Sequence, residues 1–584
     1  RYALTSWGGA NGGEVDPSTG ALKMNGNKVV IAEFARLKYA VTTHTAGGGV
    51  ITVRKVTLAS KGTDYFDEND TVEITATPNV GWQFDHWEGN LSGNETSRTV
   101  TLTSDMMITG VFVQSDNPAL VSTFASVKDF DGSLPLGQWY AKPVYMNFAV
   151  LNGQEGILGS DVSLSKTSVS VTAGQYTGVS TALADKKFTL SGVKSRMLTY
   201  STREISVDRR MRDRERELFS ERKPFAVRSA TRAVISEGTQ LTFKVTSSQG
   251  TLSRPATCKK VGTHCYIFVD NSSLQDAILT STAIANFATY FDNMAYPLDN
   301  NLFGSDPVDV DGDSHVFILF SPLGNYAEGY FSPDDKFPQS VYSDSNAHDM
   351  FYLTIPSSTS EITFLQGTLA HEYQHMINFD RRMTLSVPYE QVWLNESMSQ
   401  LAMYLCTSEL YDATPYYLNG NATSLTIWDY NELDGASIYL NYAAAQLFSV
   451  YLYDRFYQHG ITNIFRSIED SSVTGMDNVT QATGIAFNEL FCDWSTALVL
   501  SNTGVTTDPK YQYSSINLRS NGLNGLQPSY SWNLNTTSGT LTKSIRAYCP
   551  VVLAFSNIAG NSYLKIIGAS ADGVFITPDH YVSN

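Results

Sequence analysis

The chain has 584 residues, of which 42% are hydrophobic and 12% aromatic, so it can bury several cores and is not a disordered polypeptide. Its formal net charge is −17, and the acidic residues are dispersed rather than gathered in blocks. This distribution argues against binding to nucleic acid or to an anionic membrane, and no apolar stretch is long enough to span a bilayer.

The first feature in chain order is an internal repeat within residues 1–115. Trp7-Gly-Gly is followed 27 residues later by Phe34, and Trp87-Glu-Gly is followed 25 residues later by Phe112, with short alternating runs typical of strands between them. The unit resembles the internalin-type B repeat of bacterial surface proteins, which implies a stalk or spacer outside the cell. The first copy lacks its opening half, so we expect the native protein to extend further towards the N-terminus. A tryptophan that recurs with a repeat more often belongs to its core than to a ligand platform.

Two segments of different composition follow the repeat. Residues 116–200 contain short alternating runs such as Val144–Val150, broken by Gly and Asp, and these predict a β-sandwich-like domain. In residues 201–240 arginines alternate with acidic residues, and Asp208 and Arg212 have the spacing of a helical ion pair. We interpret this segment as a solvated helix or linker, because a nucleic-acid patch would not alternate its signs; a protease-sensitive junction is the second interpretation.

Strands are predicted again from Leu241, and the clearest covers Cys265–Asp270. Cys258 and Cys265 flank a predicted hairpin and can form a local disulfide, with free thiols as the alternative; too few ligands surround them to favour a second metal site. The alternate carboxylates of Asp309-Val-Asp-Gly-Asp313 are compatible with Ca²⁺, but the glycine is not at the EF-hand position, so a plain turn is the alternative.

The segment that organises the chain is His371-Glu372-Tyr-Gln-His375. Residues four apart lie on one face of a helix, so His371 and His375 can direct their imidazoles at one zinc ion, with Glu372 close enough to act on a metal-bound water. Apolar residues from Ile362 to Ile377 recur at three- and four-residue spacing and predict a helix, for which the serines and threonine at 357–360 supply capping hydroxyls.

A catalytic zinc needs three protein ligands, and Glu396 is the candidate for the third. It lies 21 residues after His375 in a second helical pattern, Val392–Leu405, and a break containing Pro388 leaves room for an antiparallel return between the two helices. The apolar residues around Glu396 favour its burial, and a buried carboxylate needs a partner.

His-Glu-x-x-His followed by Asn-Glu-x-x-Ser resembles the gluzincins of the thermolysin-like clan, and specifically the hyicolysin family of secreted bacterial metallopeptidases, over about Thr242 to Ser501. The resemblance implies a zincin-like fold, Zn²⁺ held by His371, His375 and Glu396, and Glu372 as general base. Gln400 departs from the pattern, because many members of the clan carry there an aspartate that orients the first histidine.

Such enzymes usually add a Tyr or His that donates to the developing oxyanion. Four residues are candidates for this role: Tyr439, Tyr442, His348 and His459. Tyr442 is preferred because it lies in an apolar stretch, but the sequence does not choose among them.

The sequence therefore predicts a multidomain chain with an α+β zincin-like unit behind all-β domains. The expected domains are a partial B repeat at 1–36, a B repeat at 37–115, a β-sandwich-like domain at 116–200, a charged linker or helix at 201–240, the zinc metallopeptidase at 241–505 and a small β-domain at 506–584. The expected function is an extracellular or surface-exposed bacterial zinc endopeptidase acting on proteins or peptides, including host or other extracellular proteins. A surface adhesin with a vestigial zinc site is the alternative, and an aminopeptidase ranks lower because no acidic motif is placed to hold a free amine.

Overall fold

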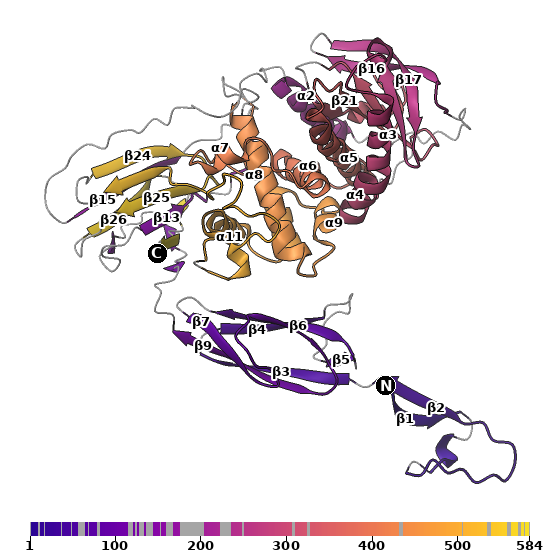
Figure 1. Ribbon diagram of the computed structural model, residues 1–584, viewed down its shortest axis with the longest axis vertical. Coiled ribbons are helices and arrows are strands. Elements are labelled where there is room, and N and C mark those ends of the chain that lie inside the picture. Colours follow the sequence, from indigo (N-terminus) through magenta and orange to yellow (C-terminus); the bar gives the residue numbers. More distant parts are fainter. Residues whose placement is uncertain are drawn as a thin grey trace. The chain divides into compact units, whose positions relative to one another are not determined.

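A computed structural model describes residues 2–582, with short gaps and with longer ones at 56–64, 136–143, 159–166, 176–203 and 222–234. The chain divides into two compact units, Arg1–Ser122 and Thr123–Asn584. The fold is multidomain and mixed α/β, and the secondary structure of the two units differs (Figure 1). None of the helices in the described residues is both long and apolar enough to cross a membrane.

The first unit is built from strands. β1 (Tyr2–Gly8) and β2 (Ile31–Arg36) form an antiparallel pair in the segment where the first copy of the repeat is predicted. The second copy forms two sheets, in the orders β5-β3-β9-β7 and β4-β6-β8. Their strands are β3 (Lys38–Ala46), β4 (Gly49–Lys55), β5 (Tyr65–Asp67), β6 (Thr71–Pro78), β7 (Trp82–Gly89), β8 (Ser97–Thr101) and β9 (Met106–Gln114).

Trp87 belongs to the core of this unit, as the repeat predicts. Its side chain is 2% exposed and packs with Ile74, Ile108 and Phe112, and its indole N–H donates to the carbonyl oxygen of Glu95 at 2.7 Å. Successive side chains of a strand point to opposite faces, so one face of β6 and one face of β9 contribute to this core. The indole is therefore not part of a ligand platform.

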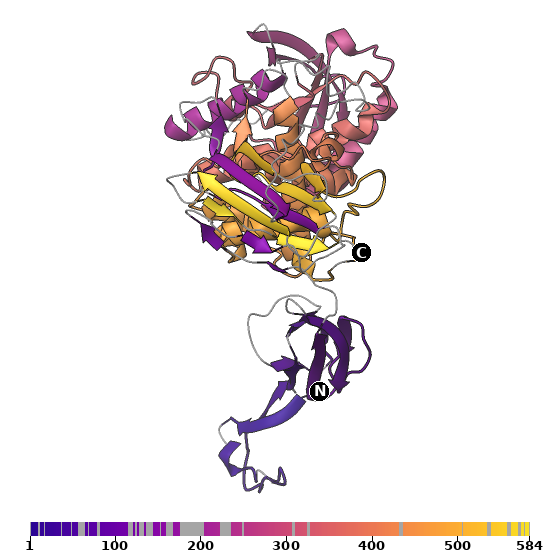
Figure 2. The ribbon, with the colours of Figure 1, turned by 90° about the vertical axis from the view of Figure 1, so that its left-hand side faces the viewer.

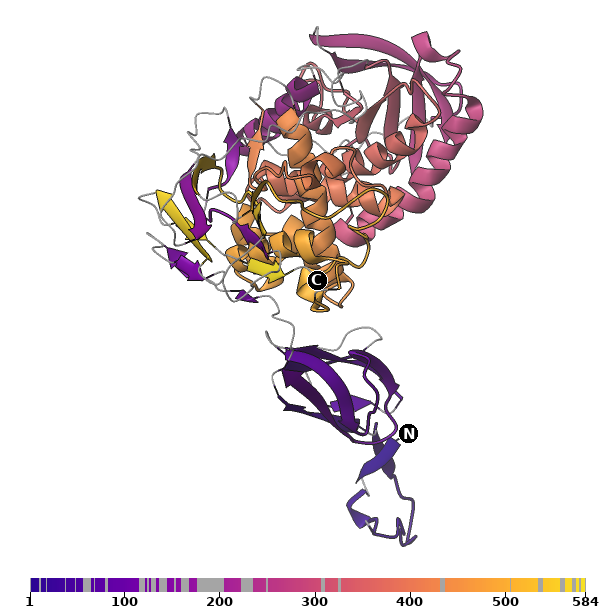
Figure 3. The same ribbon diagram turned by 60° about the vertical axis from the view of Figure 1, so that its left-hand side comes forward.

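The two β-rich segments that the sequence analysis assigned to separate domains share their sheets. One sheet contains the order β28-β13-β25-β23 and the other the order β12-β26-β15-β24. Strands before residue 176 thus alternate with strands after residue 529 (Figures 2 and 3), so the described strands of these two segments form one β-structure. The strands are β12 (Ser133–Pro135), β13 (Val144–Phe148), β15 (Thr167–Gln175), β23 (Tyr530–Asn533), β24 (Gly539–Ile545), β25 (Val551–Ser556), β26 (Ser562–Ala569) and β28 (Asp579–Val582).

The central sheet of the second unit has the order β16-β17-β18-β19-β21-β20. β18, β19 and β21 are parallel and fully buried, whereas β20 pairs antiparallel with β21 and forms the edge. The strand that leads into the His-Glu-x-x-His helix, β21, is therefore internal to the sheet. The strands are β16 (Gln240–Ser247), β17 (Gly250–Val261), β18 (Cys265–Asp270), β19 (Val316–Ser321), β20 (Gly329–Phe331) and β21 (Met350–Thr354).

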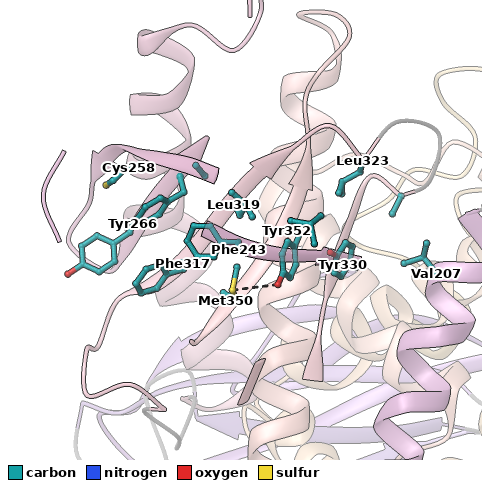
Figure 4. Close-up of a cluster of buried hydrophobic side chains, with 14 of the residues drawn as sticks. Val207, Phe243, Cys258, Tyr266, Phe317, Leu319, Leu323, Tyr330, Met350 and Tyr352 are labelled. Atoms are coloured by element: carbon teal, nitrogen blue, oxygen red, sulfur yellow. Dashed lines mark hydrogen bonds between the residues drawn. The ribbon is translucent and has the colours of Figure 1, made fainter. Parts of the chain in front are cut away.

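Aromatic and aliphatic side chains cover one face of this sheet. Phe243, Phe268 and Phe317 pack at ring distances of 5.1 to 6.4 Å, and Tyr330 stacks on Tyr352 (Figure 4). Cys258 and Cys265 are free, buried thiols, so the disulfide is not formed.

Two long helices follow the sheet, α5 (Glu361–Thr384) and α6 (Val392–Thr407), and they lie side by side (Figure 1). The predicted capping at 357–360 takes another form: Ser360 makes no capping hydrogen bond, and the Glu361 carboxylate instead accepts from the backbone N–H and the hydroxyl of Ser357, both at 2.7 Å. Gly367 allows the close approach of α5 and α6, since an added Cβ there would lie 2.9 Å from Met403.

The chain from Thr414 to Leu500 is mainly helical. Beside the short α7 (Thr414–Leu418), its helices are α8 (Ala436–Leu452), α9 (Ile464–Glu469), α10 (Gly475–Thr483) and α11 (Phe487–Leu500). On the same side of the sheet as α5, α3 (Ser281–Tyr290) and α4 (Tyr296–Phe303) are joined by a π-helical turn, and Tyr296 of α4 stacks on Tyr373 of α5.

The charged segment forms helix α2 (Glu204–Glu221) but it is not solvated on all sides. Val207, Met211, Leu218 and Phe219 are buried, and so is Arg212, which is 2% exposed. The predicted Asp208–Arg212 ion pair is present at 3.8 Å. The helix therefore packs into the interior of the second unit, which the alternating charges did not indicate.

Candidate metal centre

The candidate metal centre lies between α5 and α6. His371 Nε2 and His375 Nε2, one turn apart on α5, are 3.0 Å from each other, and Glu396 Oε2 on α6 is 3.4 and 3.5 Å from them. All three residues are buried. Among the residues that the structure describes, they form the only group of three His, Cys, Asp or Glu side chains close enough to share one ion.

These distances fit a tetrahedral zinc ion. Zinc binds imidazole nitrogen and carboxylate oxygen at about 2.0–2.2 Å, so two ligand atoms at a tetrahedral angle are separated by about 3.4 Å. The three observed separations lie within about 0.4 Å of that value. Two imidazoles and one carboxylate also leave a fourth position for water or substrate.

Glu396 provides the strongest local indication of a bound cation. Its side chain is fully buried, and within the described part of the chain neither carboxylate oxygen has a hydrogen-bond partner. A buried carboxylate without hydrogen bonds is costly unless a cation compensates it. Arg212 Nε forms an ion pair with Oε1 at 3.7 Å and supplies part of this compensation, whereas Oε2 lies 3.4 and 3.5 Å from the two histidines.

Three groups surround the second nitrogen of His375. Asn395 Oδ1 and Ser399 Oγ each lie 3.1 Å from His375 Nδ1, and Arg212 Nη1 lies 2.9 Å from it. In the tautomer that leaves Nε2 free to bind a metal, the Asn395 carbonyl oxygen accepts from Nδ1–H. The Arg212 N–H can only donate, so it competes for Nδ1 in the opposite tautomer. Burial, together with the charge of Arg212, lowers the pKa of His375 to about 3, so the imidazole is neutral, as metal binding requires.

Gln400 occupies the corresponding position beside His371. Its side-chain amide lies 3.5 Å from His371 Nδ1, and Gln446 donates to Gln400 Oε1 at 3.4 Å. A neutral amide therefore stands where the clan resemblance leads one to expect an aspartate, and it contacts the first histidine only at the limit of hydrogen-bond distance.

Glu372 lies on the cavity side of α5 and is 6% exposed. Burial raises its pKa to about 7, although the backbone N–H of Phe331 donates to its carboxylate. A carboxylate with a pKa near neutrality is suited to accept and return a proton.

A cavity of about 110 Å³ opens beside the three residues. Its walls include residues of α2, Gly329 and Tyr330 of β20, His371 and Glu372 of α5, Gln400 and Met403 of α6, and Tyr439 and Tyr442 of α8. β20 lies so close to α5 that position 329 has room only for glycine, because a Cβ there would lie 2.7 Å from Thr368.

Two of the four candidate oxyanion donors line this cavity, and two do not. Tyr439 and Tyr442 line it, and the ring of Tyr442 lies 6.3 Å from that of His371. His348 is buried elsewhere, where it pairs with Asp311 and stacks on Phe317, and His459 is exposed. The two tyrosines therefore remain candidates by position.

The carboxylates of the proposed calcium turn have protein partners. Asp311 pairs with His348, and Asp313 accepts from Tyr266 at 2.7 Å and lies 2.6 Å from His315 Nδ1. Asp309 lies outside the described residues. Calcium binding stays a prediction.

Sequence reasoning missed the groups that surround the three ligands. Asn395 and Ser399 are four residues apart on the helix that carries Glu396, so helical spacing was a usable signal for them. Arg212, Asp208 and Tyr430 come from segments far away in the sequence, and no local pattern indicates their contacts with this site.

Comparison with known proteins gives two partial matches. Residues 39–116 match a family model described as a divergent InlB B-repeat domain. Over 202 residues the chain is 32% identical to the neutral metalloprotease ShpI of Staphylococcus hyicus, a match that covers 31% of this chain and 44% of that protein. The chain thus carries a B-repeat domain and is homologous over part of its length to a metalloprotease, of which it matches less than half.

Proposed function

We propose that this chain is a zinc-dependent endopeptidase with a zincin-like catalytic unit of the gluzincin type. The observation that supports this best is the buried group of His371, His375 and Glu396, in which Glu396 has no hydrogen-bond partner among the described residues. The partial homology to a metalloprotease supports the same reading.

Each residue of the centre has a defined role in this proposal. His371, His375 and Glu396 hold the zinc, which when bound lowers the pKa of water and polarises a carbonyl group. Glu372 takes the proton from the attacking water and delivers it to the leaving amine. Tyr442 is the preferred donor to the carbonyl oxygen of the substrate, because it lines the cavity beside His371.

The edge strand gives the substrate a place to bind. β20 ends the central sheet and lines the cavity, so an extended peptide can pair with its backbone beside the metal. The substrates are accordingly proteins or peptides, bound in an extended conformation across the centre.

The B repeat supports an extracellular or cell-surface location on a bacterium, where host or other extracellular proteins are within reach. The alternative proposal of an adhesin with a vestigial metal site makes a different prediction, because it requires no hydrolysis.

Zinc content and casein cleavage by the full chain test the proposal. We expect about one zinc per chain, cleavage of unfolded casein that a chelator abolishes and zinc restores, and a Glu372→Gln variant that keeps the metal but loses at least 100-fold in rate. Cleavage that persists at the wild-type rate in Glu372→Gln would refute the assigned base. Stoichiometric zinc without any hydrolysis would favour the adhesin.

A further inference from the structure

We propose that helix α2 is an autoinhibitory segment that occupies the substrate-binding cavity of the metal centre and has to leave before a polypeptide can bind. This inference rests on the proposed function and states how access to that site is controlled.

The apolar face of α2 covers the edge of the sheet. Val207 and Met211 are 1% and 4% exposed and belong to the same buried cluster as Leu323, Tyr330 and Tyr352. Figure 4 shows Val207 at one end of this cluster, beyond Tyr330. Because Tyr330 belongs to β20, α2 covers the strand with which an extended substrate would pair.

The polar residues of the same face engage the groups that catalysis needs. Arg212 lies 2.9 Å from His375 Nδ1 and 3.7 Å from Glu396 Oε1. Asp208 accepts from the Tyr430 hydroxyl at 3.1 Å and is hydrogen-bonded to Tyr442. With α2 in place, the hydroxyl of Tyr442 is hydrogen-bonded to the Asp208 carboxylate and is not available to a substrate carbonyl group.

The remaining space is too small for a polypeptide. Pockets that take drug-sized ligands measure about 300–1,000 Å³. The cavity between α2 and the metal centre has about 110 Å³, although an endopeptidase must accommodate residues on both sides of the cleaved bond. Since α2 itself forms one wall through Val207, Asp208, Met211 and Arg212, its departure is the change that opens the site.

A single added charge tests whether α2 blocks the site. Met211→Glu places a carboxylate in the apolar contact and should release the helix, while Ser220→Glu adds the same charge to an exposed position of the same helix. Three measurements on the zinc-loaded full chain are compared: casein hydrolysis, binding of a peptidyl hydroxamate, and amide hydrogen exchange within Glu204–Glu221.

If α2 covers the cavity in at least nine of ten molecules, its release raises apparent affinity at least about tenfold. We therefore expect Met211→Glu to bind the hydroxamate and to cleave casein at least about tenfold better than wild type, with Ser220→Glu unchanged. In the wild type, saturation with the hydroxamate should accelerate exchange in α2.

Two outcomes would overturn the inference. One is fast exchange in α2 of Met211→Glu together with wild-type hydrolysis and hydroxamate affinity. The other, which is informative even if Met211→Glu does not fold, is unchanged exchange in α2 when the wild type is saturated with the hydroxamate. Released α2 and bound zinc without any hydrolysis would instead refute the proposed peptidase function.

Discussion

Replacing Glu396 by Gln tests the third ligand, because the substitution keeps the shape of the side chain and removes its charge. The carboxylate is fully buried, and its Oε2 lies 3.4 and 3.5 Å from the two imidazole nitrogens. An amide at this position offers a neutral oxygen that binds zinc far less well than a carboxylate.

The expected loss of zinc affinity can be estimated from residues that contact a metal ligand instead of the metal itself. Groups that only orient a ligand change metal affinity 10–100-fold, so loss of the charged ligand itself should raise the zinc dissociation constant at least about 100-fold. At a free zinc concentration 100 times the wild-type dissociation constant, binding stabilises the wild type by about 2.7 kcal/mol and the variant by about 0.4 kcal/mol.

Competition with a chromophoric chelator measures the affinity, and unfolding with and without zinc measures the stabilisation. Glu390→Gln is the matched control, because Glu390 is equally buried but pairs with Arg382 and Asn478 instead of with the histidines. It should destabilise the zinc-free and zinc-loaded forms equally and leave zinc affinity unchanged. Wild-type zinc affinity in Glu396→Gln would refute the assignment of the third ligand.

Three further predictions concern other parts of the chain. Asn395→Ala removes the acceptor at His375 Nδ1 and should weaken zinc binding 10–100-fold in the same competition assay; an unchanged affinity would mean that Asn395 does not orient the ring. Trp87→Ala should cost the B repeat about 3–5 kcal/mol, visible as faster hydrogen exchange across 39–116, whereas Met107→Ala, at a position 60% exposed, should have little effect. Burial raises the pKa of Glu469 from 4.5 to about 8, so the folded chain holds a proton that the unfolded chain loses, and stability should fall as the pH rises through this window. Glu469→Gln should remove that part of the pH dependence, and identical profiles in denaturant titrations would contradict it.

The grouping of the three candidate metal ligands was predictable because its geometry is local. Spacing on one helix places His371 beside His375, and the interrupted helical pattern that follows allows Glu396 to return to them. The same reasoning predicted the burial of Trp87, since an aromatic residue that recurs with a repeat belongs to its core.

The errors concern contacts between distant segments. Alternating charges on α2 indicated a solvated helix, because nothing in that pattern reveals that Arg212 contacts His375, 163 residues away. The pairing of β15 with β24 and β26 likewise depends on long-range register, so two stretches of short strands were assigned to two domains instead of one.

A crystal grown with zinc and measured at the zinc absorption edge tests the central claim most directly. We predict one strong anomalous peak about 2.0–2.2 Å from His371 Nε2, His375 Nε2 and Glu396 Oε2. A fully loaded crystal whose zinc lies elsewhere, with Glu396 turned away from both histidines, would contradict the account.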